Sequence, residues 1–287
     1  MGSGHMTRDV KSAQLAGGLK LPYVEQGDQS GVPVVLLHAF VDSWRSFERL
    51  LPHLPPSIHA FAVTQRGHGE ADRPASGYGL EELTADLAAF MDAVGLEAAV
   101  IVASSSASYT AERFAIEHPE RALGIVLIGA PRSLRDKPAV SEFSAAVSEL
   151  SDPIDPTFVR EFVESTLFRP VPPAFLEAMI GESLKVPAHV WKATLQGLLE
   201  AVPPTETATI TSPTLILWGD RDEFLPRSDQ EALAAAIPGS RLVIYKGTGH
   251  LVHWEEPERV AADIAAVAER MRPRQARALG RQPTSMR

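Results

Sequence analysis

The sequence predicts an α/β protein with a doubly wound, mostly parallel sheet that has helices on both faces. Short apolar runs rich in Val, Ile and Leu alternate along the chain with segments that repeat apolar residues at helical spacing. The apolar runs lack alternating polar residues, which is typical of parallel strands covered on both sides. Strand and helix follow one another in the rhythm of a doubly wound sheet.

Six apolar runs predict buried strands, and four periodic segments predict the helices that connect them. The strands are expected at residues 33–37, 60–64, 99–103, 124–128, 214–218 and 242–245. The helices are expected at residues 80–94, 106–118, 228–237 and 257–271. Gly95 is a plausible helix stop, and Pro257 suits a first helical turn.

Residues 133–207 break this rhythm. They contain no convincing strand, and prolines divide them into several short helical stretches with bulky apolar residues. Such a segment is too long for a connection between two elements. We therefore predict a helical cap at 133–207, inserted into a core formed by 7–132 and 208–271.

Both ends of the chain are expected to lie outside this core. Residues 1–6, Met-Gly-Ser-Gly-His-Met, look like an expression scar. Residues 272–287 are rich in arginine and poor in apolar residues, which predicts a disordered basic tail. No signal peptide is recognisable, and no apolar run approaches the roughly 20 residues that span a bilayer. A cytoplasmic location is expected.

Composition narrows the possible partners. The net charge of −9 argues against a dedicated nucleic-acid or anionic-membrane binder, because phosphate contact needs a basic surface. The chain has no cysteine, so disulfides, thiolate zinc sites and cysteine nucleophiles are excluded. The expected partner is a small-molecule substrate, and the sequence leaves a homo-oligomer open.

The segment 100–108 has the form of a nucleophile elbow. A buried strand leads directly into a helix through a turn of small residues, which a strained strand-to-helix turn requires. The usual pattern is G-x-S-x-G, and here it is Ala103, Ser105, Ala107. The motif alone leaves Ser104 and Ser106 open, but the strand end and the unbroken helix favour Ser105 at the apex.

Two later loops provide an acid and a base. Asp220 and Asp222 follow the strand expected at 214–218, and Asp222 is favoured because Asp220, directly after a glycine, can cap the turn itself. His250 follows the last strand in a glycine-rich loop, which favours it over His253. The order Ser105, Asp222, His250, each just past a strand, is the Ser…Asp…His order of a serine triad.

On these residues the chain resembles the α/β-hydrolase superfamily, and most closely its capped bacterial serine esterases, lactonases and metal-free haloperoxidases. The resemblance rests on the elbow and on segments 36–40, 65–74, and 247–250 with 256–260. It implies an eight-stranded sheet and an activity that needs no metal or organic cofactor. It also implies that the backbone N–H groups of Phe40 and Ser106 form the oxyanion hole.

The chain departs from this family pattern at four positions beside the expected site, one of which is Ser104, where the family often has histidine. Ala39, Ala103 and Ala107 stand where glycine is usual, so each adds a methyl group near the oxyanion hole. The substrate pocket is expected to be apolar. The residues expected to line it are Trp44, Phe143, Phe162 and Trp191.

These features predict a serine hydrolase that cleaves an ester or lactone of a small, largely apolar substrate through an acyl-enzyme. A perhydrolase or a carbon–carbon bond hydrolase would use the same triad. A ligand-binding pseudo-hydrolase is a third hypothesis, supported by the three alanines. Dehalogenase and epoxide hydrolase chemistry is disfavoured, because those relatives have Asp where this chain has Ser105.

Overall fold

A computed structural model of the protein describes residues 9–135 and 137–278. The expected expression scar at 1–6 lies outside the described residues. Eight strands form one sheet in the order β1-β2-β4-β3-β5-β6-β7-β8. Strands β3 to β8 run parallel to one another, while β1 and β2 pair antiparallel at one edge. The predicted fold class is confirmed.

All six predicted strands are present, and two further strands precede them. The strands are β1 (Val10–Gln14), β2 (Lys20–Gln26), β3 (Val32–Leu37), β4 (Ile58–Val63), β5 (Ala99–Ser104), β6 (Ala122–Ile128), β7 (Thr214–Gly219) and β8 (Arg241–Tyr245). β4, β5, β6 and β7 are buried along their whole length, as their continuous apolar sequences predict.

Successive side chains of the central strands point to opposite faces of the sheet and enter two separate cores. On one face Ile101 and Leu127 pack with residues of the helices α1 (Leu80–Ala93), α2 (Ala107–Glu117) and α8 (Arg227–Ala236). On the other face Val102 and Val126 pack with α10 (Pro257–Ala278). Both faces are therefore covered.

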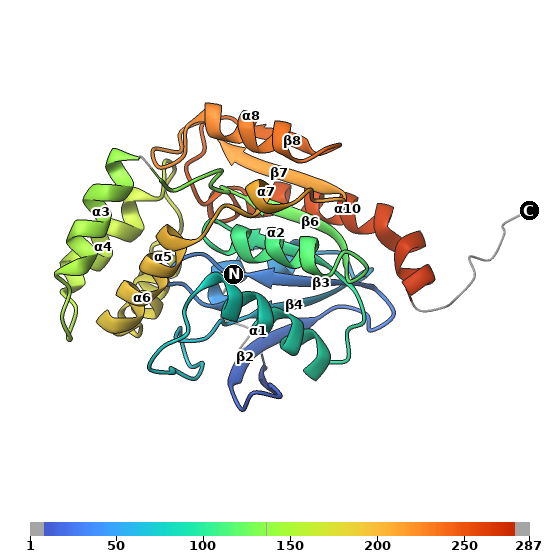
Figure 1. The fold of residues 1–287 in the computed structure, drawn as a ribbon, viewed down its shortest axis with the longest axis horizontal. Coiled ribbons are helices and arrows are strands. Elements are labelled where there is room, and N and C mark those ends of the chain that lie inside the picture. The colour runs from blue at the N-terminus through green and yellow to red at the C-terminus, as the bar shows by residue number, and fades with distance from the viewer. Residues whose placement is uncertain (1–8, 136, 279–287) are drawn as a thin grey trace, which may run out of the picture.

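Five helices lie between β6 and β7, in the segment predicted to be a cap. They are α3 (Pro138–Ser148), α4 (Pro156–Ser165), α5 (Pro173–Leu184), α6 (Ala188–Glu200) and α7 (Pro204–Thr207). Each of these helices has proline in its first turn or directly before it, where a missing N–H costs nothing. Figure 1 shows α3 to α6 together at the end of the sheet toward which the β3 and β7 arrows point.

The expectation of a disordered tail from residue 272 is wrong for its first part. Helix α10 continues through Arg272 to Ala278. Two side chains of this extension bind backbone carbonyls of the core: Arg274 Nη1 donates to Leu123 of β6 at 3.1 Å, and Gln275 Nε2 donates to Gly31, just before β3, at 3.2 Å. Residues 279–287 lie outside the described part of the chain.

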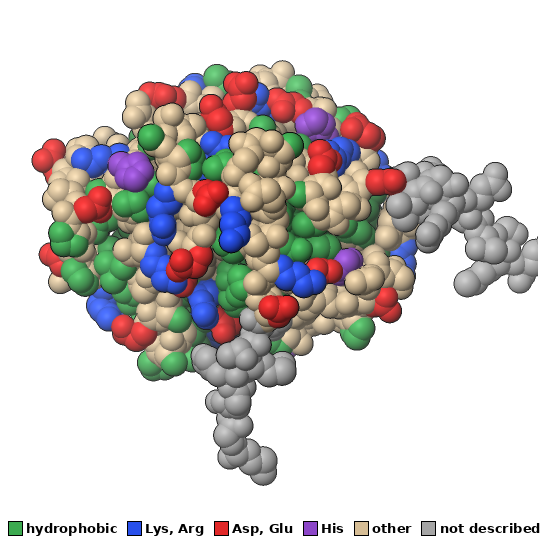
Figure 2. All heavy atoms as spheres, turned by 90° about the horizontal axis from the view of Figure 1, so that it is seen from below, with side chains coloured by type: hydrophobic (Ala, Val, Ile, Leu, Met, Phe, Trp, Pro, Cys, Tyr) green, Lys and Arg blue, Asp and Glu red, His purple; other side chains and the backbone are tan. Residues whose placement is uncertain are grey.

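The surface carries charges of both signs. On the face in Figure 2, acidic and basic side chains are interspersed with apolar ones. Among the described residues, none of the helices is long and apolar enough to cross a bilayer.

Candidate active site

Ser105 stands on a strained turn between β5 and α2. Its φ is +49°, a backbone conformation that residues other than glycine rarely adopt. The turn is fixed on both sides, because the Ser105 amide donates to the Ile128 carbonyl at 2.7 Å and the Ser108 amide donates to the Ser105 carbonyl at 2.9 Å. The small neighbours Ala103 and Ala107 fit the buried space on either side. The hydroxyl of Ser105 is thereby presented at the end of the sheet.

His250 lies within hydrogen-bond distance of both Ser105 and Asp222. His250 Nε2 is 2.8 Å from Ser105 Oγ, and His250 Nδ1 is 2.7 Å from Asp222 Oδ2. Because an ionised carboxylate only accepts, the arrangement assigns the ring proton to Nδ1 and leaves Nε2 to accept from the serine hydroxyl. The structure thus brings together the three residues that the sequence predicts as a triad.

Asp222 and Asp220 have different surroundings. The carboxylate of Asp222 is fully buried, and its second oxygen accepts the backbone N–H groups of Phe224 at 2.9 Å and Leu225 at 3.0 Å. Asp220 is partly exposed and accepts the Gly247 N–H at 2.6 Å. Asp220 therefore fixes the loop, while Asp222 faces the imidazole.

His253 lies away from the serine, in a buried polar cluster. Its Nε2 is 3.1 Å from Ser46 Oγ, and Ser46 in turn donates to Asp42 at 3.0 Å and accepts from Trp254 Nε1 at 2.8 Å. Burial lowers the pKa of His253 to about 3 and raises the pKa of Asp42 to about 7. This histidine is therefore neutral and acts in packing.

Two glycines allow the loop between β8 and α9 (Val252–Glu255), which carries His250 and is called the histidine loop below, to approach the sheet. A Cβ at Gly129, directly after β6, would lie 2.8 Å from the His250 carbonyl oxygen. A Cβ at Gly219, at the end of β7, would lie 2.2 Å from the carbonyl oxygens of Thr248 and Gly249. No other residue fits at these positions without displacing His250. The sequence signal for both is a glycine at the end of an apolar run.

Phe40 and Ser106, the two residues expected to form the oxyanion hole, lie beside Ser105 in the cavity lining. Both residues line the cavity in front of the serine, and neither amide donates to an acceptor among the described residues. Val41, next to Phe40, has a φ of +56°, which is a rare conformation for a β-branched residue. Two free N–H groups beside a nucleophile can stabilise a developing oxyanion.

The three alanines lie behind this space. Ala39, Ala103 and Ala107 are buried, and none of them lines the cavity in front of Ser105. Ala39 and Ala107 instead border a smaller cavity on the other side of Phe40 and Ser106. The added methyl groups therefore leave the approach to the serine open.

A mostly apolar cavity of about 100 Å³ lies between Ser105 and the helices of the cap. Among the described residues that line it, Thr166 is the only one with a polar side chain apart from Ser105, Ser106 and His250, and the Thr166 hydroxyl donates to the Val163 carbonyl at 2.7 Å. The remaining lining residues are Phe40, Pro131, Leu134, Val140, Phe143, Phe162, Leu195, Leu198, Phe224 and Leu225.

Three of the four aromatic residues expected at the pocket form one aromatic group. Phe143 and Phe162 line the cavity and stack with ring centroids 4.8 Å apart. Trp191 is fully buried behind them, 5.3 Å from the Phe40 ring and 5.6 Å from the Phe162 ring. Trp191 thus supports the lining from a second layer. Phe224 and the leucines of α6 were not expected, since nothing in their local sequence marks them.

The prediction that Trp44 lines the pocket is wrong. Trp44 begins a short 3₁₀ helix, Trp44–Phe47, and packs in the core on the α10 side of the sheet. Its amide donates to Thr64 Oγ1 at 3.1 Å, and the Arg45 guanidinium lies over its indole. The turn that follows Phe40 therefore directs this ring into the core.

Comparison with known proteins shows the family to which the chain belongs. The sequence pattern that defines the alpha/beta hydrolase family matches residues 34–263 of this chain. "Epoxide hydrolase 4" from Mus musculus is 24% identical over 85% of this chain and 74% of its own length. A "putative non-heme chloroperoxidase" from Synechocystis is 26% identical over 84% of this chain and 97% of its own.

Among solved structures, a thermophilic esterase from Thermogutta terrifontis superposes with a TM-score of 0.80 at 25% identity, over 92% of this chain and 99% of that one. The family match spans the core strands from β3 onward, the positions of Ser105, Asp222 and His250, and the intervening cap helices. The protein is a member of the alpha/beta hydrolase family.

Proposed function

We propose that the protein is a serine hydrolase that cleaves a carboxylic ester or lactone. The observation that carries this proposal is the continuous hydrogen-bond chain from Asp222 through His250 to Ser105, which ends at a cavity with two free backbone amides. Nucleophile, base, orienting acid and oxyanion donors are the groups that acyl transfer needs.

In this mechanism Ser105 Oγ attacks the ester carbonyl carbon while His250 Nε2 takes the hydroxyl proton. The carbonyl oxygen becomes an oxyanion between the Phe40 and Ser106 amides, and each donor contributes about 2–4 kcal/mol to the transition state. The protonated His250, stabilised by Asp222, then gives its proton to the leaving alkoxide. Water, deprotonated by His250, attacks the acyl-enzyme; the bond to Ser105 Oγ then breaks, His250 returns the proton to Oγ, and the acid is released.

The cavity indicates a small, neutral and apolar substrate. None of the described lining residues other than His250 has an ionisable side chain, so a charged acyl group would lose its hydration without gaining a partner among them. The stacked rings of Phe143 and Phe162 provide a flat apolar wall. We infer that the preferred acyl group is short or aromatic.

A perhydrolase is the second candidate, and the similarity to a chloroperoxidase favours it. In that reaction hydrogen peroxide replaces water in the second step, attacks the Ser105 acyl-enzyme and leaves as a peracid. The same triad and the same cavity serve both reactions. The two candidates therefore differ in the acceptor of the acyl group.

The test uses a fluorophosphonate probe and the variant Ser105→Ala. The wild type is expected to gain one covalent adduct, located at Ser105 by mass spectrometry, and the variant none. A panel of p-nitrophenyl esters and lactones, with and without hydrogen peroxide, then separates hydrolase from perhydrolase. A folded wild type without an adduct would support a ligand-binding protein and overturn the proposal. Equal ester turnover by Ser105→Ala would exclude Ser105 as the nucleophile.

A further inference from the structure

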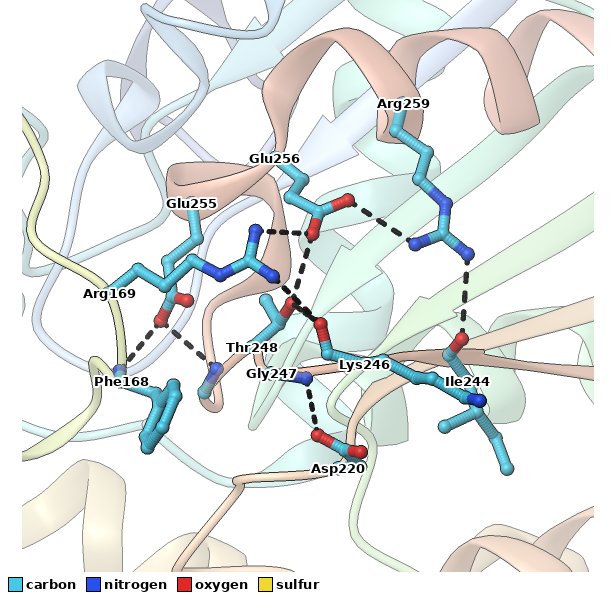
Figure 3. A network of polar contacts seen from close by, with 11 residues as sticks. Phe168, Arg169, Asp220, Ile244, Lys246, Gly247, Thr248, Glu255, Glu256 and Arg259 are labelled. Atoms are coloured by element: carbon cyan, nitrogen blue, oxygen red, sulfur yellow. Dashed lines mark hydrogen bonds and ion pairs between the residues drawn. The ribbon is translucent and has the colours of Figure 1, made fainter.

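One short segment of the cap, residues 166–169, contacts both loops that carry the acid and base of the triad. It directly follows α4 and is far from these loops in sequence. Figure 3 shows its residues Phe168 and Arg169 against the turn at Lys246 to Thr248 and against Glu255 and Glu256. The cap therefore meets the core at the catalytic histidine as well as above the cavity.

The backbone of His250 itself is bonded to this segment. The His250 amide donates to the Thr166 carbonyl at 2.9 Å. Thr166 also lines the cavity in front of Ser105. The cap residue that holds the histidine peptide thus also borders the substrate space.

Glu255 joins the same two segments through one oxygen. Its Oε1 accepts the Phe168 N–H of the cap at 2.8 Å and the Gly249 N–H of the histidine loop at 3.0 Å. The carboxylate is half-buried, burial raises its pKa, and its other oxygen has no partner among the described residues. A carboxylate in this position depends on the two amides it accepts, because charge-assisted bonds are about twice as strong as neutral ones.

The close approach leaves no room for a side chain at residue 249. A Cβ at Gly249 would lie 2.6 Å from the Phe168 amide nitrogen, 2.8 Å from Glu255 Oε1 and 2.9 Å from the Thr166 carbonyl oxygen. The glycine before the catalytic histidine is therefore required by the cap segment. This is an independent sign that the contact is part of the folded site.

Arg169 forms a second, outer link. Its Nη1 donates to Glu256 Oε1 at 2.7 Å and its Nη2 donates to the Lys246 carbonyl at 2.8 Å (Figure 3). The Arg169 side chain is 44% exposed, so the ion pair itself contributes little. The guanidinium nevertheless links the cap to residues on both sides of the histidine loop, Lys246 and Glu256.

The cap segment 166–169 also contacts the acid loop, which is the loop between β7 and α8 that carries Asp222. The Arg221 guanidinium, next to Asp222, lies 5.3 Å from the centre of the Phe168 ring. The Arg221 amide donates to the Thr248 carbonyl at 3.0 Å, which joins the acid loop to the histidine loop. Acid loop, histidine loop and cap segment thus form one connected unit.

We propose that Glu255 is a positioning residue for His250, and that the cap segment 166–169 acts through Glu255 to hold the histidine in line with Asp222 and Ser105. This inference rests on the proposed function of the triad. It makes the cap a support of the catalytic base in addition to a wall of the cavity.

The variant Glu255→Gln tests the inference with Glu258→Gln as its matched control. Glu258 is a nearby glutamate whose side chain is 83% exposed. The measurement is the rate at which a fluorophosphonate labels Ser105, which needs no knowledge of the substrate. We expect Glu255→Gln to slow labelling about tenfold, because weaker bonds let the histidine loop move, and Glu258→Gln to label at the wild-type rate.

A second readout follows His250 directly. The low-field proton signal of His250 Nδ1–H, assigned by its loss in Asp222→Asn, reports the bond between the two residues. It is expected to broaden or move upfield in Glu255→Gln and to stay unchanged in Glu258→Gln. This signal is independent of turnover. If the wild type were not labelled at all, the proposed function would fail while the signal would still test the inference.

A second variant, Arg169→Met, covers the case in which Glu255→Gln does not fold. Arg169 is exposed at the surface, so this variant is expected to fold and to slow labelling about threefold, a smaller effect that reflects the exposed pair. A role in stability alone would lower the melting temperature of Glu255→Gln without changing the labelling rate or the proton signal. That result, or labelling within twofold of the wild type in both variants, would overturn the inference.

Discussion

The two halves of the candidate active site differ in what they contribute and in how their residues are fixed. The core contributes Ser105, Asp222 and His250, each just beyond the carboxyl end of a strand and each held by backbone hydrogen bonds. The cap contributes the Phe143 and Phe162 rings and further apolar side chains, held by packing alone. In the proposed function the core therefore determines the reaction, and the cap determines which acyl group fits.

The largest expected effect is a loss of ester turnover that differs between the two aspartates of the acid loop. Asp222→Asn is expected to lower ester turnover about 10⁴-fold, because an amide in place of the carboxylate favours the wrong imidazole tautomer. Asp220→Asn is expected to change turnover less than threefold, since its amide oxygen can still accept the Gly247 N–H. The measurement is kcat/KM for the best ester of the panel.

This pair of variants also shows how the assignment would fail. If Asp222→Asn kept more than a tenth of the wild-type kcat/KM, Asp222 would not be the acid of the triad. If both variants lost activity equally, the loss would come from the loop as a whole, and the division of roles between the two carboxylates would be wrong.

The core could be predicted from the sequence because its backbone constrains the residue types. A buried parallel strand needs an unbroken apolar run, and a strained turn needs small neighbours such as Ala103 and Ala107. The strands β1 and β2 gave no such signal, because they form an antiparallel edge with several exposed residues. The extra length of α10 was missed because it depends on long-range bonds, such as Arg274 to the Leu123 carbonyl.

The cap could be predicted as helical, but the orientation of its side chains could not. Phe143, Phe162 and Trp191 are all large aromatic residues of the cap, yet the first two line the cavity and the third lies behind it. Which of them faces the substrate depends on the angle at which each helix packs, and no local pattern encodes that angle. The same holds for the contact between Glu255 and the cap segment.

The second largest expected effect is on the pH dependence of stability, and it comes from His253, a core histidine outside the proposed triad. The pKa of His253 falls from 6.5 to about 3 on burial, so the unfolded chain binds a proton at a higher pH than the folded protein does. His253 therefore contributes stability above pH 6.5 that is lost as the pH falls toward 3. At about 1.4 kcal/mol per pKa unit, the loss is on the order of a few kcal/mol.

Replacing His253 by phenylalanine is expected to remove this part of the acid sensitivity. The ring would retain its packing against Phe47, and Ser46 would keep its bonds to Asp42 and Trp254. The check is urea unfolding of both proteins at pH 7 and pH 4: the free energy of unfolding should fall less in the variant. An equal fall in both would show that His253 is solvated, and a large loss of turnover at pH 7 would link it to the site.

The smallest expected effect distinguishes two phenylalanines one turn apart on α4. Phe162 lines the cavity, whereas the Phe158 ring lies 5.8 Å from Trp191 and outside the lining. Phe162→Ala is expected to shift the ratio of kcat/KM for octanoyl over acetyl esters about tenfold toward the longer chain, because apolar pockets discriminate by about 1–3 kcal/mol per methylene at most. Phe158→Ala is the control and should leave the ratio unchanged. An equal shift in both variants would mean that cap stability, and not the shape of the cavity, sets the acyl preference, and the division between core and cap would then be weaker than the geometry indicates.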